Sequence, residues 1–397
     1  MRRSKANAMH ILHLTPYYTP AYAFGGVVRA VEGMTRALVR CGHQVTVLTT
    51  DALDQSSRYD GPPDETLDGV RVVRVPNLSV RLRGRYNLST PNKMRQAALE
   101  ALPGVDVLHC HEFRTVENLL VTPAAKQRGI PLVLSPHGTL RLDTGRSRLK
   151  QWWDRILSPA LAQRFDHVIG LTQAEIDDVQ ALWPSFGRRR IPATFSVIPN
   201  GIDPEVYTNL TGGDSFREKY GLGEGPVVLF MGRLHRRKGV DILARAFRQV
   251  AGDDARLVIV GPDEGMLATL QTLIDARVII TGYLDGADRL AALAAADIFA
   301  LPAIGEGLSM AVLEALGAGL PVILSPECNL PEAEAVGAGL IVAPEVSVLA
   351  EALRTLLDDP DGRKGMGVAA RQLIHERFTW DGVAIQLEKG YMQHIAL

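Results

Sequence analysis

Short runs of apolar residues alternate along the chain with stretches whose apolar residues recur at helical spacing. The first run, residues 9–15, predicts a strand, and Val28, Val31, Met34 and Leu38 then follow the spacing of one helix face. This alternation is typical of a parallel sheet covered by helices on both sides. Further strands in the first half are expected at residues 43–49, 70–75, 105–110, 131–135, 166–171 and 195–198.

The alternation begins again after a turn-rich segment. Residues 199–204 are rich in Pro and Gly, and residues 208–225 are polar and glycine-rich, which predicts a domain boundary and hinge. Strands are then expected at 227–231, 256–260, 278–280, 298–301, 322–324 and 340–342, and helices at 239–250 and 289–295. The predicted fold class is α/β. Residues 1–205 and 206–378 are each expected to form a Rossmann-like, doubly wound parallel-sheet domain, and a helix at 379–397 is expected to cross back to the first domain.

The composition excludes several classes of protein. With 397 residues, 46% hydrophobic and 22% charged, the chain resembles an ordinary globular protein, and its net charge of -1 disfavours a nucleic-acid partner. Three widely spaced cysteines cannot form a disulfide framework, which fits a reducing compartment. No apolar run approaches the roughly 18 residues of a membrane span, and no signal peptide is evident, so a cytoplasmic location is expected.

The strongest chemical signal follows the strand expected at 298–301. A loop with Gly305 and Gly307 carries Glu306 and leads into a helix expected to begin near Leu308. Glu314, inside that helix, would lie about 12 Å from Glu306 even in one continuous helix. The two carboxylates are therefore too far apart for the pair of a retaining hydrolase, which needs about 5 Å.

Between the two glutamates, the start of this helix offers backbone amides that suit an anion, and Ser309 adds a hydroxyl. A ligand with a central diphosphate and hydroxyl-rich groups at both ends, such as a nucleotide sugar, would fit. The alternative is a capped surface helix with solvated acids.

A second signal lies at residues 230–239. Gly232 follows a predicted strand and permits a close approach or a positive φ, and Arg233 and Lys238 flank the loop. An Arg fork and a Lys point charge suit a diphosphate. The alternative, a solvated basic loop, is what we expect for His235, Arg236 and Arg237.

These motifs resemble those of glycosyltransferase family 4 over nearly the whole chain. The matching segments are residues 232–239, the Glu306-x7-Glu314 motif, residues 296–302, 319–323 and 197–203, Gly25-Gly26 and His137-Gly138. The resemblance implies the GT-B fold, with two domains facing across a cleft, and retention of anomeric configuration. Many members have an aromatic residue and Gly or Pro where this chain has Leu308-Ser309.

The resemblance also implies roles for individual residues. Arg233 and Lys238 would bind the donor diphosphate, Glu306 the donor sugar and Glu314 the ribose diol. His137 would face the sugar from the other domain. The remaining donor contacts would come from Gly26, Gly232, Gly307 and the amides of Leu308, Ser309 and Met310, with Tyr283 and Leu284 near the base.

A metal site is not expected. Asp359 and Asp361 are typical of a turn. His109 and His111 would share one strand face, opposite Cys110, but two ligands make a poor site and no third is evident nearby. His10 and His13 are expected in the core or at strand ends.

The acceptor is less defined by the sequence. Net charges of +7 for residues 1–205 and -8 for the remainder favour an anionic or membrane-associated acceptor for the first domain. Basic residues surround Trp152-Trp153 and recur over residues 81–95, which favours contact with an anionic membrane surface. In the alternative interpretation, the tryptophans belong to the core and the arginines are solvated. The basic residues concerned are Arg81, Arg83, Arg85, Lys93, Arg95, Arg141, Arg146, Arg148, Lys150 and Arg155.

We therefore predict a metal-independent retaining hexosyltransferase without a cofactor. It would transfer sugar from a UDP- or GDP-type donor to a saccharide or lipid-linked acceptor, in surface polysaccharide or glycolipid synthesis, with contact to the inner membrane face through the basic domain. The alternatives are a nucleotide-sugar-binding protein without transferase activity and an NAD-dependent oxidoreductase, although no G-x-G-x-x-G motif occurs.

Overall fold

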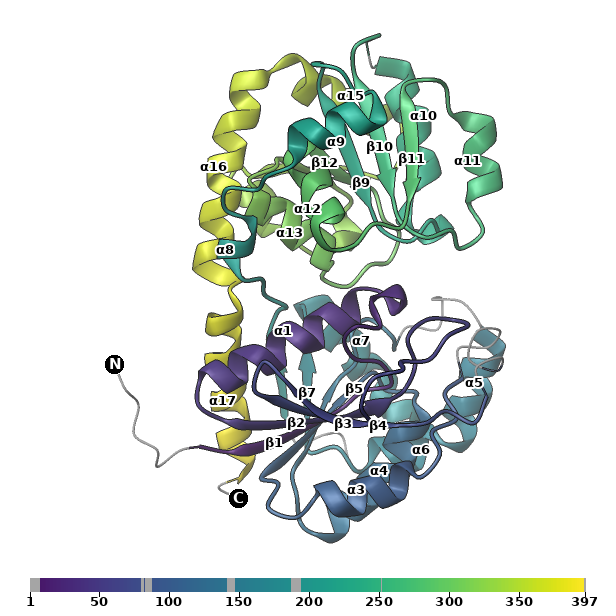
Figure 1. The fold of residues 1–397 in the computed structure, drawn as a ribbon, viewed down its shortest axis with the longest axis vertical. Helices are drawn as coiled ribbons and strands as arrows, with labels where there is room; N and C mark the ends of the chain where they lie inside the picture. Colours follow the sequence, from purple (N-terminus) through teal and green to yellow (C-terminus); the bar gives the residue numbers. More distant parts are fainter. Residues whose placement is uncertain are drawn as a thin grey trace. The chain divides into compact units, whose positions relative to one another are not determined.

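The computed structural model describes residues 8–79, 82, 88–140, 147–186, 194–250 and 252–395. The chain forms two compact units, each built on its own sheet (Figure 1). Unit 1 comprises Met1–Asn200 together with Trp380–Leu397, and unit 2 comprises Gly201–Thr379.

Unit 1 contains an eight-stranded sheet in the order β3-β4-β2-β1-β5-β6-β7-β8. Its strands are β1 (His10–Leu14), β2 (Gln44–Thr50), β3 (Asp64–Leu67), β4 (Val70–Val75), β5 (Val107–His111), β6 (Leu132–Ser135), β7 (His167–Gly170) and β8 (Thr194–Val197). Its described helices are α1 (Gly26–Arg40), α3 (Met94–Ala101), α4 (Val116–Gln127), α5 (Ser147–Ile156), α6 (Ser158–Ala162), α7 (Gln173–Leu182) and α17 (Trp380–Ile395).

The predicted apolar stripe of α1 is confirmed, because Val28, Val31, Met34 and Leu38 are all buried. α1 also packs against the C-terminal helix α17 of the same unit (Figure 1). Gly33 makes this contact close, since a Cβ atom there would lie 2.1 Å from the Trp380 indole nitrogen.

The parallel sheet predicted for unit 1 also carries an antiparallel edge strand that was not predicted. β3 pairs antiparallel with β4 through a turn at Asp68 and Gly69, both of which have positive φ. Such a two-residue turn matches the twist of a hairpin. β3 reads Asp-Glu-Thr-Leu, which lacks the apolar run that marks the other strands, so the pattern did not reveal it.

Unit 2 contains a six-stranded, all-parallel sheet in the order β11-β10-β9-β12-β13-β14. Its strands are β9 (Val227–Met231), β10 (Arg256–Val260), β11 (Val278–Gly282), β12 (Ile298–Leu301), β13 (Val322–Leu324) and β14 (Gly339–Ile341). Its helices are α8 (Pro204–Tyr207), α9 (Gly213–Tyr220), α10 (Val240–Val250), α11 (Leu267–Leu273), α12 (Gly286–Ala295), α13 (Met310–Ala318), α14 (Glu332–Ala335), α15 (Val346–Asp358) and α16 (Pro360–Arg377), with 3-10 turns η4 (Arg236–Lys238) and η5 (Pro326–Cys328).

The strand order of unit 2 is that of a doubly wound Rossmann-like sheet, and its order reverses between β9 and β12. Ligands of such sheets bind outside the carboxyl ends of the strands at this switch point. The loops that follow β9 and β12 are the ones that carry the two strongest motifs of the sequence.

Candidate active site

The two motif loops of unit 2 lie side by side. The amide of Ile304 donates to the carbonyl of Arg237 at 2.6 Å, and the Arg237 guanidinium donates to the carbonyl of Gly305. These bonds join the turn after β9 to the loop after β12. Residues about 68 positions apart in sequence thus share one edge of the sheet.

At this junction the Lys238 ammonium donates to a carboxylate oxygen of Glu306. The two side chains are only 15% and 20% exposed, so water screens the pair less than it would on an open surface. The Glu306 loop is itself anchored, because the Asn329 amide donates to the Glu306 carbonyl at 2.7 Å. The structure therefore pairs the Lys238 ammonium, from the turn after β9, with the Glu306 carboxylate on the anchored loop after β12.

Gly239 allows the two loops to approach closely. Its φ is +64°, and a Cβ atom there would lie 2.0 Å from the carbonyl oxygen of Pro302. Gly221 has nearly the same φ, +62°, but a Cβ atom there would meet nothing within 4 Å.

We expect Gly221→Ala to lower the free energy of unfolding by about 1 kcal/mol, the cost of a left-handed backbone. Gly239→Ala adds a backbone clash to the same cost, so a loss of about 3 kcal/mol or more is expected. Urea denaturation of the two variants measures the difference. Equal losses would mean that the two loops can separate freely.

The helix α13 begins at Met310, two residues beyond the expected start at Leu308. Ser309 is its N-cap residue, and within the described residues the Ser309 side chain makes no capping hydrogen bond. The first turn of a helix leaves its backbone amides without intrahelical partners, and the helix dipole favours an anion there. Gly307 and Glu306 lie three and four residues before this helix start.

Glu314 lies inside α13 and is 2% exposed, where it accepts a hydrogen bond from the Arg289 guanidinium of α12. Burial opposes the charge on Arg289, but Glu314 and Tyr207 together outweigh burial and raise the pKa of the guanidinium. Sequence analysis missed Arg289, because no spacing rule links a residue of α12 to one of α13.

The other half of the basic motif is placed differently. Arg233 is 48% exposed on its side chain and pairs with Glu264 at 3.0 Å, so the structure brings Lys238, and not Arg233, to Glu306. Gly232 does not have a positive φ. The close backbone contact expected at Gly232 depends instead on Gly261, where a Cβ atom would lie 1.8 Å from the Gly232 carbonyl oxygen.

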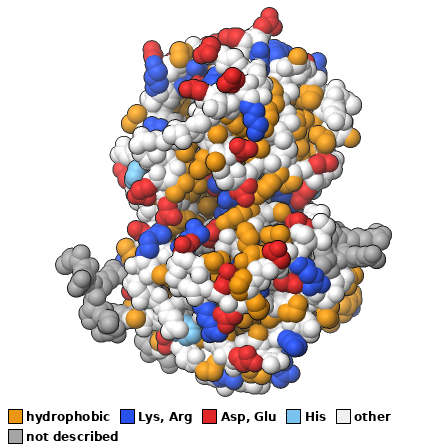
Figure 2. All heavy atoms as spheres, viewed as in Figure 1, with side chains coloured by type: hydrophobic (Ala, Val, Ile, Leu, Met, Phe, Trp, Pro, Cys, Tyr) orange, Lys and Arg blue, Asp and Glu red, His pale blue; other side chains and the backbone are white. Residues whose placement is uncertain are grey.

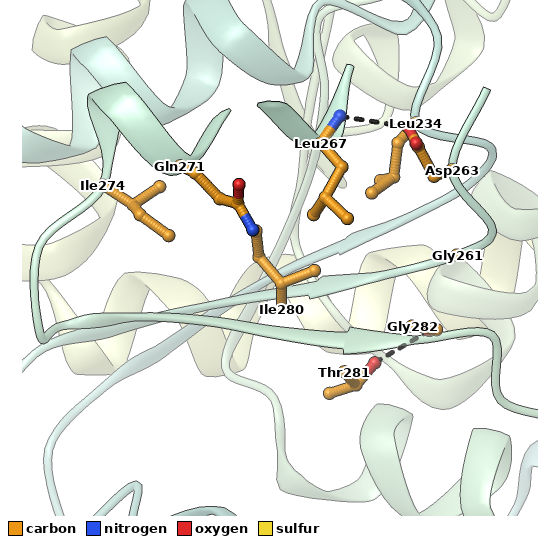
Figure 3. Close-up of a pocket in the computed structure, with 9 residues that line it drawn as sticks. All are labelled: Leu234, Gly261, Asp263, Leu267, Gln271, Ile274, Ile280, Thr281 and Gly282. Atoms are coloured by element: carbon orange, nitrogen blue, oxygen red, sulfur yellow. Dashed lines mark hydrogen bonds between the residues drawn. The ribbon is translucent and has the colours of Figure 1, made fainter. Parts of the chain in front are cut away.

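A cavity of about 440 Å³ lies beside the carboxyl ends of β10 and β11 (Figure 3). Figure 3 shows the Gln271 amide directed from α11 toward β11. The Leu267 amide donates to Asp263 Oδ1 at 3.0 Å. Gly282 lines the cavity and leads into Tyr283, which is 45% exposed, and Leu284, which is buried.

In unit 1, His137 follows β6 on a strained loop, with φ values of +53° for His137 and +72° for Gly138. Glu175, at the start of α7, accepts the Gly138 amide at 2.5 Å. Arg114 donates to the carbonyls of Thr139 and Leu140. Burial lowers the pKa of His137 to about 4, so its imidazole is neutral at pH 7.

The histidines behind this loop correct one expectation. His109 and His111 share a face of β5, but a third imidazole is also present: His13, buried on the neighbouring strand β1. One ligand nitrogen from each of the three lies within 4.8 Å of the others. The sequence did not link His13 to these two residues, because His13 is 96 or more residues away and only the pairing of β1 with β5 brings it there.

The sequence singled out two further features, Gly26 and the Asp359/Asp361 pair. Gly26 opens α1, and the N-cap Gly25 has a φ of +99°, so no side chain caps this helix start within the described residues. Asp359 caps α16 through a 2.8 Å bond from the Gly362 amide.

The alternative interpretation, in which both tryptophans belong to the core, is wrong for Trp152, which is 54% exposed on α5. Ile156 on the same helix is 53% exposed. Trp153 is half-buried, and Lys93, Arg95 and Arg155 are exposed. Arg81, Arg83, Arg85, Arg141, Arg146 and the Arg148 side chain lie outside the described residues.

On the face shown in Figure 2, acidic and basic side chains are interspersed. Among the helices that the structure describes, none combines the length and apolar character of a membrane span.

Comparison with known proteins identifies the class. Residues 24–206 match the model of "Glycosyltransferase Family 4", and residues 225–359 match "Glycosyl transferases group 1". The GDP-mannose-dependent monoacylated alpha-(1-6)-phosphatidylinositol monomannoside mannosyltransferase of Corynebacterium glutamicum is 38% identical over 203 residues, 47% of this chain. This chain spans about half (53%) of that relative.

Two solved structures share the whole fold. Sucrose-phosphate synthase from Thermosynechococcus elongatus has a TM-score of 0.76 at 20% identity, covering 98% of this chain and 99% of that one. Anabaena HepE in complex with UDP and glucose has a TM-score of 0.75 at 21% identity, covering 97% and 100%. The fold is GT-B, and the chain belongs to glycosyltransferase family 4.

Proposed function

We propose that this glycosyltransferase moves a hexosyl group from a nucleoside diphosphate sugar to a hydroxyl acceptor with retention of configuration. The observation that carries the proposal is the pairing of Lys238 with Glu306 at the switch point of unit 2, beside the start of α13. A cation and helix amides suit the diphosphate, and the carboxylate suits sugar hydroxyls.

In the proposed reaction the bond between the anomeric carbon and the diphosphate oxygen breaks, and negative charge develops on the diphosphate. Lys238, Arg233 and the amides of Leu308, Ser309 and Met310 stabilise that charge. The acceptor oxygen then bonds to the anomeric carbon on the same face, and its proton passes to the leaving phosphate. No protein nucleophile is required.

Further residues hold the donor in this proposal. Glu306 accepts from sugar hydroxyls, Glu314 from the ribose diol, and His137 faces the sugar. Gly26, Gly232 and Gly307 let backbone approach the phosphates, and Tyr283 and Leu284 lie near the base. Metal independence and the absence of a cofactor belong to the same proposal, because these charges come from the chain itself.

The names of similar proteins support a GDP or UDP donor. One relative is described as GDP-mannose-dependent, and HepE is described with UDP and glucose. The same relative's acceptor is a phosphatidylinositol mannoside, which supports a glycolipid acceptor here. Exposed Trp152 and Ile156 beside Arg155 on α5 support contact with an anionic membrane surface during that synthesis.

Thermal unfolding in the presence of UDP, GDP, ADP and their sugars tests the donor. A nucleotide at 100 times its dissociation constant is expected to add about 2.7 kcal/mol to stability and to raise Tm. If no nucleotide raises Tm, the donor site is wrong.

A protein that only binds nucleotide sugars is the second candidate. Slow hydrolysis of the bound donor, lost in Lys238→Ala, distinguishes the enzyme from such a protein. Binding without any hydrolysis or transfer would favour the second candidate.

A further inference from the structure

Three histidines of unit 1 form a continuous hydrogen-bonded line. His13 Nδ1 lies 2.9 Å from His111 Nε2, and His111 Nδ1 lies 2.9 Å from His137 Nε2. His13 and His111 are fully buried on the paired strands β1 and β5, and His137 follows the next strand, β6. The line thus runs from the interior of the sheet to the loop assigned to the donor sugar.

We infer that His13 and His111 are positioning residues that hold His137 as the tautomer with its proton on Nδ1, which makes His137 a hydrogen-bond donor toward the transferred sugar. This inference rests on the proposed function of His137. It goes beyond that function because it assigns roles to two residues that do not contact the sugar.

A neutral imidazole has one N–H donor and one acceptor nitrogen. Burial lowers the pKa of His13 to about 3 and that of His111 well below its usual range, so these two rings are neutral, as His137 is. Only two arrangements of protons then satisfy both hydrogen bonds of the line.

In the first arrangement every ring is protonated on Nδ1. His13 donates to His111, His111 donates to His137, and His137 keeps its Nδ1–H for a ligand. In the second arrangement every ring is protonated on Nε2, and donation runs the opposite way.

The far end of the line distinguishes the two arrangements. His13 Nε2 is buried and has no hydrogen-bond partner among the described residues. The second arrangement would bury an unpaired N–H donor there, whereas the first leaves only an unpaired acceptor. Among buried backbone groups, orphaned N–H donors are rarer than under-satisfied acceptors, and we apply the same preference to this buried imidazole. The first arrangement is therefore favoured.

The loop that carries His137 is held independently of its ring. Glu175 accepts the Gly138 amide, and Arg114 joins the carbonyls of Thr139 and Leu140 to Asp154. With the backbone fixed at a positive φ, the remaining freedom of His137 is the orientation and tautomer of its ring. The hydrogen bond from His111 fixes both the orientation and the tautomer of the His137 ring.

The 15N NMR signals of histidine side chains in the full-length protein test the inference, because a protonated and an unprotonated ring nitrogen differ in shift. The His137 signals are assigned by their loss in His137→Asn. We expect a protonated Nδ1 and a bare Nε2. A protonated Nε2, or a pattern unchanged in His111→Leu, would overturn the inference.

His111→Asn is the conservative variant, since its amide N–H replaces the donor at Nδ1. We expect it to keep the His137 signal pattern and to retain kcat within about threefold. His111→Leu should lower kcat about tenfold, the equivalent of one hydrogen bond. The nucleotide-induced rise in Tm should stay unchanged, because His111 is not among the proposed contacts of the nucleotide. His167→Asn is the control, at a buried histidine of β7 whose ring nitrogens contact the hydroxyls of Thr194 and Ser196.

Two results separate this inference from neighbouring hypotheses. If the His137 tautomer changes in His111→Leu but kcat does not, the line exists and the proposed role of His137 in transfer is wrong. A metal ion retained at one equivalent by the purified protein, and lost in His13→Leu, would overturn the line, because a metal and the shared proton compete for the same nitrogen lone pairs.

Discussion

Replacing Lys238 by Ala is expected to slow sugar transfer by about 100- to 1,000-fold, the usual cost of removing one preorganised group that stabilises developing charge. Lys238 is the cation that the fold brings to Glu306, and both side chains are largely shielded from water. The loss should fall mainly on kcat, because charge on the diphosphate grows as the bond to the sugar breaks. Initial rates with the donor identified by thermal unfolding measure it.

Arg236→Ala is the matched control. Arg236 belongs to the same 3-10 turn, η4, but is exposed. The Arg236→Ala substitution removes the same positive charge from the same turn. A long-range effect of net charge would therefore slow both variants alike. We expect Arg236→Ala to keep the rate within about threefold, because exposed charges are screened by salt. Similar losses in both variants would contradict a specific role for Lys238.

The sequence could predict much of the fold because buried parallel strands read as short apolar runs. The strands at 227–231, 256–260, 298–301 and 322–324 are confirmed to the residue. The strand β3 could not be predicted in this way, because an exposed edge strand needs no apolar run.

The candidate site was predictable only in part. Motifs that follow strands were recognised because the ends of parallel strands collect at one sheet edge, and the fold does join the loops of Lys238 and Glu306. Contacts between elements distant in sequence were not predictable: the bond of His13 to His111 depends on strand order, and that of Arg289 to Glu314 on helix packing.

Arg289→Leu is expected to lower the free energy of unfolding by about 3–5 kcal/mol, because it leaves the carboxylate of Glu314 buried without its partner. Both side chains are at most 10% exposed, so water cannot replace the lost interaction. Urea denaturation measures the loss. Lys219→Ala, which breaks the exposed pair with Asp288, is the control and should leave the midpoint unchanged.

The double variant Arg289→Leu/Glu314→Leu separates charge from packing. Replacing both partners of a buried pair with apolar residues is often close to neutral, so the double variant should recover most of the stability that Arg289→Leu loses. Because Glu314 is proposed to bind the ribose diol, the same double variant should lose the rise in Tm caused by nucleotide. The double variant could instead recover its stability and keep the full rise in Tm caused by nucleotide. That result would show that Glu314 only pairs with Arg289, and Glu314 would then not belong to the donor site.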